Sequence, residues 1–217
     1  MDSGYDKIGV MFQDREDAGQ QLAKRLAHYR GTDAVVLALP RGGVVIGYEI
    51  VRALRLPLDI VVTRKIGHPD NPEYALCAVD EKGTLLCDEA ERESVGKEWL
   101  KKEVERQRKE AERRVRAYRG KEEPAEIKGK TAIIVDDGIA TGLTMRLAVR
   151  AVKAEMPKRV VVAVPVAPRD IVQKLTREVD ELIVLLPPEE FAGAVGAHYR
   201  EFEQVEDDTV IRLLRSR

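Results

Sequence analysis

Short runs of Val, Ile and Leu alternate with helical segments along most of this chain, and this alternation limits the folds open to it. The runs carry very few polar residues, which is typical of strands buried on both faces of a parallel sheet. Several of them are followed by segments with apolar residues at helical spacing. This order predicts an α/β fold with a doubly wound, mainly parallel sheet. The predicted strands are residues 34–40, 58–62, 131–137, 159–166 and 181–186.

Other segments complete the predicted order of elements. Residues 14–29 have the apolar spacing of a first helix, which Asp14 is suited to cap. Residues 63–74 are rich in turn formers and charge, so we expect a loop there. The apolar residues on either side of 81–83 predict a hairpin.

Charged residues make up 35% of the 217 residues, compared with the usual quarter or so. The 37 Lys and Arg residues nearly balance the 38 Asp and Glu residues, which excludes a strongly basic nucleic-acid coat and an acidic tail protein. Much of the excess lies in residues 88–119, which predict a long exposed helix with one narrow apolar stripe. Acids and bases are interleaved there, so we interpret it as a solvated surface helix and not as a stripe that binds nucleic acid.

The lack of long apolar stretches, the N-terminal residues and the two cysteines bear on the cellular compartment of the protein. No stretch approaches the roughly 20 apolar residues that cross a bilayer, and residues 1–16 lack the apolar block of a signal peptide. We therefore expect a cytoplasmic protein. Cys77 and Cys87 have no zinc-site spacing, so we expect reduced structural cysteines, with a redox pair as the alternative. The single Asn and the high charge favour a heat-adapted source.

Residues 136–144 carry the most informative pattern in the chain. Two adjacent carboxylates, Asp136 and Asp137, end a predicted strand. A short loop of Gly, Ala and Thr follows, and a helix begins where the loop ends. Small side chains let backbone N–H groups approach a ligand, and a helix N-terminus favours an anion. The pattern therefore predicts a phosphate site beside two acids, as a ribose 5-phosphate would require; a solvated turn is the alternative.

Other phosphate-binding motifs fit this loop poorly. It has no Lys after its second Gly, as a GxxxxGK[ST] loop requires, and it has no GxGxxG. Residues 135–144, VDDGIATGLT, instead resemble the phosphoribosyl pyrophosphate (PRPP) motif of type I phosphoribosyltransferases. The resemblance implies that Asp136 and Asp137 bind the ribose hydroxyls. It assigns the 5-phosphate to the loop residues Gly138, Ile139, Ala140, Thr141, Gly142 and Thr144, where Gly138 replaces an aliphatic residue of many members.

Residues 40–43 provide a second match, to the loop that binds pyrophosphate in that family. Gly42 and Gly43 would let the backbone close around an anion, and Arg41 would add charge-assisted hydrogen bonds. The resemblance also implies a cis peptide bond between Pro40 and Arg41. A tight turn is the alternative interpretation of these residues.

Residues 63–74 correspond to the mobile loop that covers the reaction centre in the family. Arg64 and Lys65 are predicted to reach the leaving pyrophosphate as the loop closes. Glu73 or His68 is a candidate for acting on a substrate proton. Ordinary exposed loop residues are the alternative for these side chains.

The implied reaction is displacement of pyrophosphate at C1 of PRPP by a nucleobase-like acceptor. We expect Asp137 to act as general base and Asp136 to hold ribose. Mg²⁺ would arrive with the substrate, with Asp136 as its candidate protein ligand. Phe191 and Tyr199 are candidates to stack on a flat acceptor, with core packing as the alternative. A PRPP-sensing protein without turnover is the competing function.

We predict one domain over residues 1–217, with a charged helical insertion at 88–128. Residues 187–217 are predicted to form part of the acceptor hood and a C-terminal helix. The matched blocks cover residues 34–80 and 130–187, about half the chain. The rest is similar to uncharacterised phosphoribosyltransferase-like proteins, which share FxDRxxAGxxLA, here residues 12–23. The resemblance allows a homodimer, and we expect neither a nucleic-acid nor a membrane partner.

Overall fold

A computed structural model describes residues 11–216 of the chain. Five parallel strands form its central sheet in the order β2-β1-β6-β7-β8. Helices lie on both faces of this sheet, so the predicted doubly wound, mainly parallel α/β fold is confirmed. The strands are β1 (Val35–Ala38), β2 (Leu58–Ile60), β6 (Thr131–Val135), β7 (Arg159–Val164) and β8 (Glu181–Val184).

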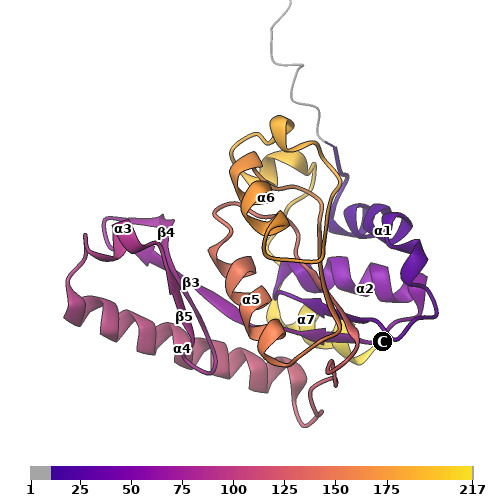
Figure 1. Cartoon of the computed structure of the whole chain (residues 1–217), viewed down its shortest axis with the longest axis horizontal. Coiled ribbons are helices and arrows are strands. Elements are labelled where there is room, and N and C mark those ends of the chain that lie inside the picture. Colours follow the sequence, from indigo (N-terminus) through magenta and orange to yellow (C-terminus); the bar gives the residue numbers. More distant parts are fainter. Residues whose placement is uncertain (1–10, 217) are drawn as a thin grey trace, which may run out of the picture.

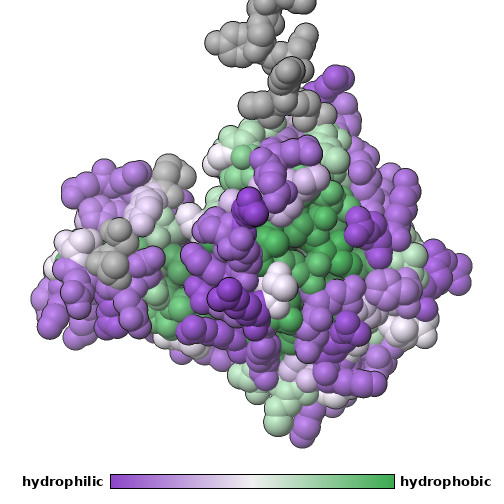
Figure 2. All heavy atoms as spheres, turned by 45° about the horizontal axis from the view of Figure 1, so that its top comes forward, coloured by the Kyte–Doolittle hydropathy of each residue, from purple (hydrophilic) through white to green (hydrophobic). Residues whose placement is uncertain are grey.

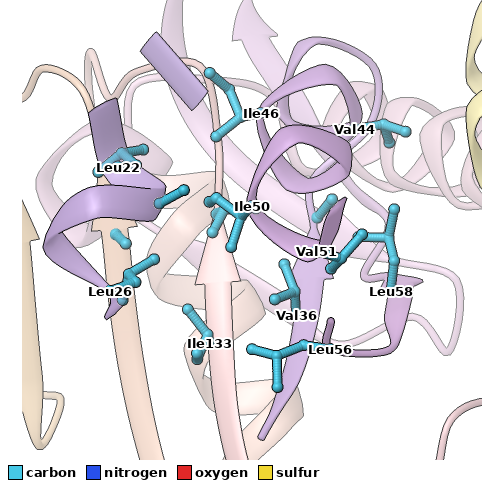
Figure 3. Packing of buried hydrophobic residues seen from close by; sticks show 14 of the residues in the cluster. Leu22, Leu26, Val36, Val44, Ile46, Ile50, Val51, Leu56, Leu58 and Ile133 are labelled. Carbon is cyan, nitrogen blue, oxygen red and sulfur yellow. The ribbon is translucent and has the colours of Figure 1, made fainter. Parts of the chain in front are cut away.

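Two apolar cores fill the space between the sheet and its helices, because successive strand residues point to opposite faces. Val36 and Ile133 belong to the core that α1 (Arg15–Arg25), α2 (Gly42–Leu54) and α7 (Asp207–Arg215) share. Figure 3 shows Leu22 of α1 and Ile50 of α2 packing toward these strands. Ile134 belongs to the other core, under α5 (Leu143–Ala154) and α6 (Arg169–Thr176).

The predicted helix at residues 14–29 is divided in two. Asp14 caps α1 through a hydrogen bond from the Asp17 N–H to its Oδ1 (2.8 Å). The segment continues after α1 as a short 3-10 helix, η1 (Ala27–Tyr29). Two further 3-10 helices, η2 (Pro188–Glu190) and η3 (Val195–His198), lie between β8 and α7. In the part of the chain that is described, no helix is long and apolar enough to cross a membrane.

Residues 63–74 form a hairpin, so the prediction of a loop is wrong for most of them. The antiparallel strands β3 (Thr63–His68) and β4 (Asn71–Asp80) meet at a turn formed by residues 69 and 70. The turn-forming residues suggested a wider loop, whereas Thr63 and Ile66 of β3 are buried. The hairpin predicted around residues 81–83 is confirmed, since β5 (Leu85–Cys87) pairs with β4.

These three strands and the helices that follow form an arm, residues 63–119, that extends away from the central sheet (Figure 1). It contains α3 (Glu89–Arg92) and the long charged helix α4 (Lys97–Arg119). Leu100 of α4 packs against the arm's small core, and Ala111 and Tyr118 bury the other end of the helix. Figure 2 shows mostly hydrophilic residues over the arm's outer surface, as expected for a solvated helix.

The arm contains a disulfide bond between Cys77 and Cys87, which overturns the expectation of reduced cysteines. The two residues are direct partners in the antiparallel pair β4–β5, and their Cα atoms lie 4.0 Å apart. Ten residues separate them in sequence, and this spacing alone did not place them opposite each other. The hairpin register does so.

A hydrogen bond from Tyr118 to Asp207 joins α4 to α7, with 2.6 Å between Tyr118 Oη and Asp207 Oδ1. Tyr118 is buried. We expect Tyr118→Phe to lower the free energy of unfolding by about 1–2 kcal/mol, because the bond to a carboxylate is lost while the ring packing stays. Urea denaturation measures this loss. Arg106→Gln, which removes an exposed ion pair with Glu103, should change it by less than about 1 kcal/mol; equal losses in the two variants would contradict the prediction.

Candidate active site

The central strands β1 and β6 end side by side at one edge of the sheet. Ala38 lies opposite Val135, and the Leu39 N–H donates to the Val135 carbonyl (3.0 Å). From this pair the chain proceeds to β2 on one side and to β7 and β8 on the other. In open α/β sheets, ligands bind outside the carboxyl ends of strands where the order reverses in this way. The loops 40–43 and 136–142 both begin there.

Asp136 and Asp137, the acid pair, follow β6 at this point. The Asp137 N–H donates to Asp136 Oδ1 (2.8 Å). Burial and the adjacent Asp137 carboxylate raise the pKa of Asp136 well above its usual range. Burial also raises the pKa of Asp137, and the Arg15 guanidinium opposes this rise. The acid pair can therefore bind a hydrogen-bond donor or a cation.

Arg15 is a site residue that the sequence analysis did not single out. Its Nε lies 2.7 Å from Asp137 Oδ2, and the side chains of Arg15 and Asp137 are 12% and 17% exposed. Tyr199 holds the same residue from another side, since its hydroxyl donates to the Asp137 carbonyl (2.6 Å). The only sequence signal for Arg15 was its place in the motif at residues 12–23.

The predicted 138–144 loop follows β6, but its last two residues, Leu143 and Thr144, form the start of α5. Gly142 precedes the helix with φ +77°, a left-handed conformation that favours glycine. Ala140 and Thr141 are exposed and lie next to the N-terminus of α5, whose dipole favours an anion. Ile139 is buried and its N–H donates to the Val166 carbonyl (2.9 Å), so this N–H is already engaged.

A cavity of about 470 Å³ borders the outer side of this loop. It lies between α5, α6 and β4, with Ala140 and Thr141 on one wall and Tyr74 on another. Arg146 and Lys174 also line it, and each is paired with an acid, Arg146 with Glu178 and Lys174 with Asp170.

The 40–43 loop packs directly against the acid pair. The Pro40–Arg41 peptide bond is cis, which confirms that prediction. A methyl group added to Gly42 would overlap the Asp137 carboxylate, and one added to Gly43 would lie 3.1 Å from Asp136 Oδ1. Both glycines are thus needed for this close approach. The two predicted loops therefore meet.

Arg41 directs its side chain away from the place predicted for pyrophosphate. Its Nη1 lies 3.6 Å from Asp207 Oδ1 and 3.9 Å from Glu206 Oε2, at the start of α7. Ion pairs of this length with a partly exposed partner are weak. Arg41 is therefore held by acids in this structure and would have to turn to meet an anion.

Arg64 and Lys65 lie on β3 in the arm and not in a loop. Arg64 Nε donates to Gln107 Oε1 of α4 (3.1 Å), and burial together with Arg114 lowers the pKa of Arg64. Strand alternation places Lys65 on the opposite face, which it shares with Thr63. Thr63 Oγ1 donates to the Thr144 carbonyl (3.3 Å), so this face is the one turned toward α5.

His68 lies at the far end of the same strand. Its Nδ1 accepts from the Asp70 N–H (3.2 Å), and its Nε2 lies 3.4 Å from Ser94 Oγ before α4. The structure therefore places His68 at the end of β3 in the arm and does not bring it to the acid pair. Glu73 belongs to β4, and its side chain lies outside the described part of the chain.

The two aromatic residues proposed for the acceptor have different surroundings. Tyr199 is buried, with its ring 5.3 Å from that of Phe12 and 4.8 Å from that of Phe202. This position favours core packing, the alternative stated for it. Phe191 is half-buried, and its ring lies 5.5 Å from that of His198.

The acid pair suits a hard cation only in part. Among the side chains that the structure describes, no group of three His, Cys, Asp or Glu residues could hold a metal ion. Asp137 already contacts Arg15, which leaves Asp136 as a carboxylate for Mg²⁺. Mg²⁺ commonly takes one or two carboxylates and completes its shell with water and substrate phosphates. The residues therefore fit an ion that arrives with a phosphate ligand.

The chain is similar to known proteins in both sequence and structure. A family model described as phosphoribosyl transferase domain matches residues 12–184. Proteins from two Mycobacterium tuberculosis strains, described provisionally as phosphoribosyl transferases, are each 42% identical over 206 residues, which is 94% of this chain. The chain spans about half the length of these relatives, 46%. The crystal structure of TT1426 from Thermus thermophilus shares 43% identity and a TM-score of 0.77, covering 95% of this chain and 98% of that one.

Proposed function

Since the chain belongs to the phosphoribosyl transferase domain family, we propose that it transfers the 5-phosphoribosyl group of PRPP to a nucleobase-like acceptor and releases pyrophosphate. The observation that carries this proposal is the meeting of the 40–43 and 138–144 loops at the acid pair. One loop would hold pyrophosphate and the other the 5-phosphate. The ribose hydroxyls would lie between them, on Asp136 and Asp137.

In the proposed reaction, a ring nitrogen of the acceptor forms a bond to C1 of PRPP. The bond from C1 to the pyrophosphate oxygen breaks, and pyrophosphate leaves with the electron pair. The proton of the acceptor N–H passes to a base, for which Asp137 is our candidate. Its carboxylate carries the Arg15 ion pair and therefore stays ionised more readily than that of Asp136.

Charge on the leaving group must be balanced by cations. Mg²⁺ bound to PRPP would supply most of this balance, with Asp136 as its protein contact. Arg41 and Arg64 are the side chains we propose for the rest, because they lie near enough to each other for the charge of Arg41 to help lower the pKa of Arg64. Arg41 would first have to leave Glu206 and Asp207. Its ion pairs with them are long, at 3.9 and 3.6 Å, and therefore weak enough to break when an anion binds.

A PRPP-sensing protein without turnover is the second candidate function. One observation favours it: Arg41 and Asp137, two residues proposed for the chemistry, are both paired with other protein side chains. A sensor would keep the ribose and phosphate sites while its acids and bases remain so paired. An enzyme would release these pairs when both substrates are bound.

We expect PRPP with Mg²⁺ to raise the melting temperature by about 5–10 °C at 100 times its Kd, because a ligand of the folded state adds about 2.7 kcal/mol at that ratio. Differential scanning fluorimetry measures the rise, with Mg²⁺ alone as control. Pyrophosphate release is then followed with a panel of nucleobases. Release that depends on one base establishes the transferase, whereas binding without release establishes the sensor. Absence of any rise at millimolar PRPP would contradict both.

The remaining expectations accompany this proposal. We propose a heat-adapted protein that works in the cytoplasm and pairs as a homodimer, and Phe191 remains our candidate for acceptor contact. We also propose that residues 1–217 form one domain, with residues 88–128 as an insertion and residues 187–217 as part of the hood.

A further inference from the structure

The first described residues of the chain pair with a segment just before α7, beside the acid pair. The Phe12 N–H donates to the His198 carbonyl (3.1 Å), and the Arg200 N–H donates to the Phe12 carbonyl (3.0 Å). The Glu201 N–H donates to the Gln13 carbonyl (2.9 Å), which extends this parallel bridge. We call residues 11–15 and 198–203 the terminal pair. The terminal pair places the side chains of Arg15 and Tyr199 against Asp137.

Arg15 is the more informative of these side chains. Besides its ion pair with Asp137, its Nη1 donates to the Glu203 carbonyl (2.8 Å), and its guanidinium lies 3.8 Å from the centre of the Phe202 ring. A guanidinium has a rigid fork of donors, so three contacts of this kind fix its orientation. With three partners and a side chain that is only 12% exposed, Arg15 is more constrained than an ordinary surface arginine.

The backbone that carries Arg15 is equally fixed. Arg15 is the first residue of α1, directly after the capping residue Asp14. Four residues later, Gly19 lets α1 approach α2 closely, since a methyl group there would lie 2.8 Å from Glu49 Cβ. Leu22 is fully buried on the same helix. The motif at residues 12–23 thus supplies residues that fix the position of Arg15 as well as residues of the core.

We propose that Arg15 is a positioning residue that holds the Asp137 carboxylate aimed at the bound ribose. This inference rests on the proposed PRPP site. The groups that face Asp137 are Arg15 from α1, the adjacent Asp136, and the Tyr199 hydroxyl, which contacts the Asp137 carbonyl. Arg15 supplies the positive charge among them. It offsets the repulsion between adjacent carboxylates and frees Asp136 for the substrate or its cation.

Removing Arg15 should therefore weaken PRPP binding by the folded protein. Without the contact from Arg15 Nε, the Asp137 carboxylate can turn away from the ribose hydroxyls. A residue that only stabilised the fold would lower the melting temperature without changing the Kd for PRPP of the folded protein.

The test compares Arg15→Gln, Arg15→Lys and wild type by isothermal titration with PRPP and Mg²⁺ at a temperature where all three are folded. We expect Arg15→Gln to weaken binding about 10- to 100-fold. Arg15→Lys, which keeps the charge, should stay within about fivefold. Arg119→Gln is the matched control, because it breaks the Arg119–Asp59 pair of similar burial that joins α4 to β2. It should leave the Kd unchanged.

A second measurement separates this inference from the proposed function. A crystal structure of ligand-free Arg15→Gln should show the Asp137 carboxylate turned from its wild-type position, and Arg15→Lys should keep it in place. If wild type fails to bind PRPP, the proposed function falls, and this position alone decides the role of Arg15. An unmoved carboxylate, or equal PRPP affinity of Arg15→Gln and wild type, would overturn the inference.

Discussion

Asp136→Asn is expected to make the ligand-free protein more stable while it abolishes PRPP binding. The carboxyl of Asp136 is buried beside a second carboxylate, which raises its pKa well above the usual range. An amide has nearly the same shape, keeps the oxygen that accepts from the Asp137 N–H, and never ionises. At pH 8 we expect the melting temperature to rise by about 2–6 °C, or roughly 1–2 kcal/mol for a chain of this length.

The stabilisation expected for Asp136→Asn depends on pH. In the unfolded chain Asp136 loses its proton near its ordinary pKa of about 4, whereas the folded state retains it to higher pH. Raising the pH through this interval therefore favours the unfolded state. The advantage of Asp136→Asn should be small near pH 4 and should grow as pH rises. Thermal denaturation from pH 4 to pH 9 measures it.

Asp137→Asn is the matched control and should have the opposite effect on stability. It breaks the ion pair with Arg15 and leaves that guanidinium half-satisfied, at a cost of about 2–3 kcal/mol. Both variants should lose the PRPP-dependent rise in melting temperature. Destabilisation of Asp136→Asn to the same extent as Asp137→Asn would show that the two acids are held alike, contrary to the structure.

The parts of the site that sequence could predict are those encoded within a few residues. A buried strand, two acids, small residues and a helix follow one another at residues 131–144, and a buried strand, a short loop and a glycine-led helix follow one another at residues 35–54. Parallel pairing of β1 and β6 then brings the two loops together without further information. The fold and the meeting of Gly42 with Asp137 follow from these local patterns.

The parts that could not be predicted depend on pairing between distant residues. Arg15 and Asp137 are 122 residues apart in sequence, and their contact depends on the terminal pair. Cys77 and Cys87 are brought opposite each other by strand register. Arg41 turns to Asp207 because α7 begins beside it, which no pattern near residue 41 indicates.

Residues 63–74 were misassigned for a different reason. Their Gly, Pro and charged residues argued for a loop, but in β3 the polar side chains take partly exposed positions while Thr63 and Ile66 are buried. Tertiary pairing with β4 thus overrode the local signal. As a consequence Arg64 packs on α4, and the covering role predicted for this segment stays a prediction that needs the arm to move.

Gly42→Ala should damage the site more than any other substitution of one methyl group. The added carbon would overlap Asp137 Oδ2 and lie 2.5 Å from its Cγ and 2.8 Å from Arg15 Nε. Gly42 is the first residue of α2, where alanine is favoured over glycine as a helix former. Any harm therefore comes from the contact and not from the backbone. We expect loss of about 1–3 kcal/mol of stability, as overpacking costs, and at least a 10-fold rise in the Kd for PRPP.

Gly96→Ala is the control, because a methyl group there meets no atom within 4 Å and the residue precedes α4 with φ −64°. Thermal denaturation and titration with PRPP compare the two. Combining Gly42→Ala with Arg15→Gln adds a further test, since both act on the Asp137 carboxylate and contacting residues are not additive. The double variant should then bind PRPP about as weakly as the worse single variant. Fully additive losses would mean that Gly42 acts on the pyrophosphate directly and that its closeness to Asp137 is incidental.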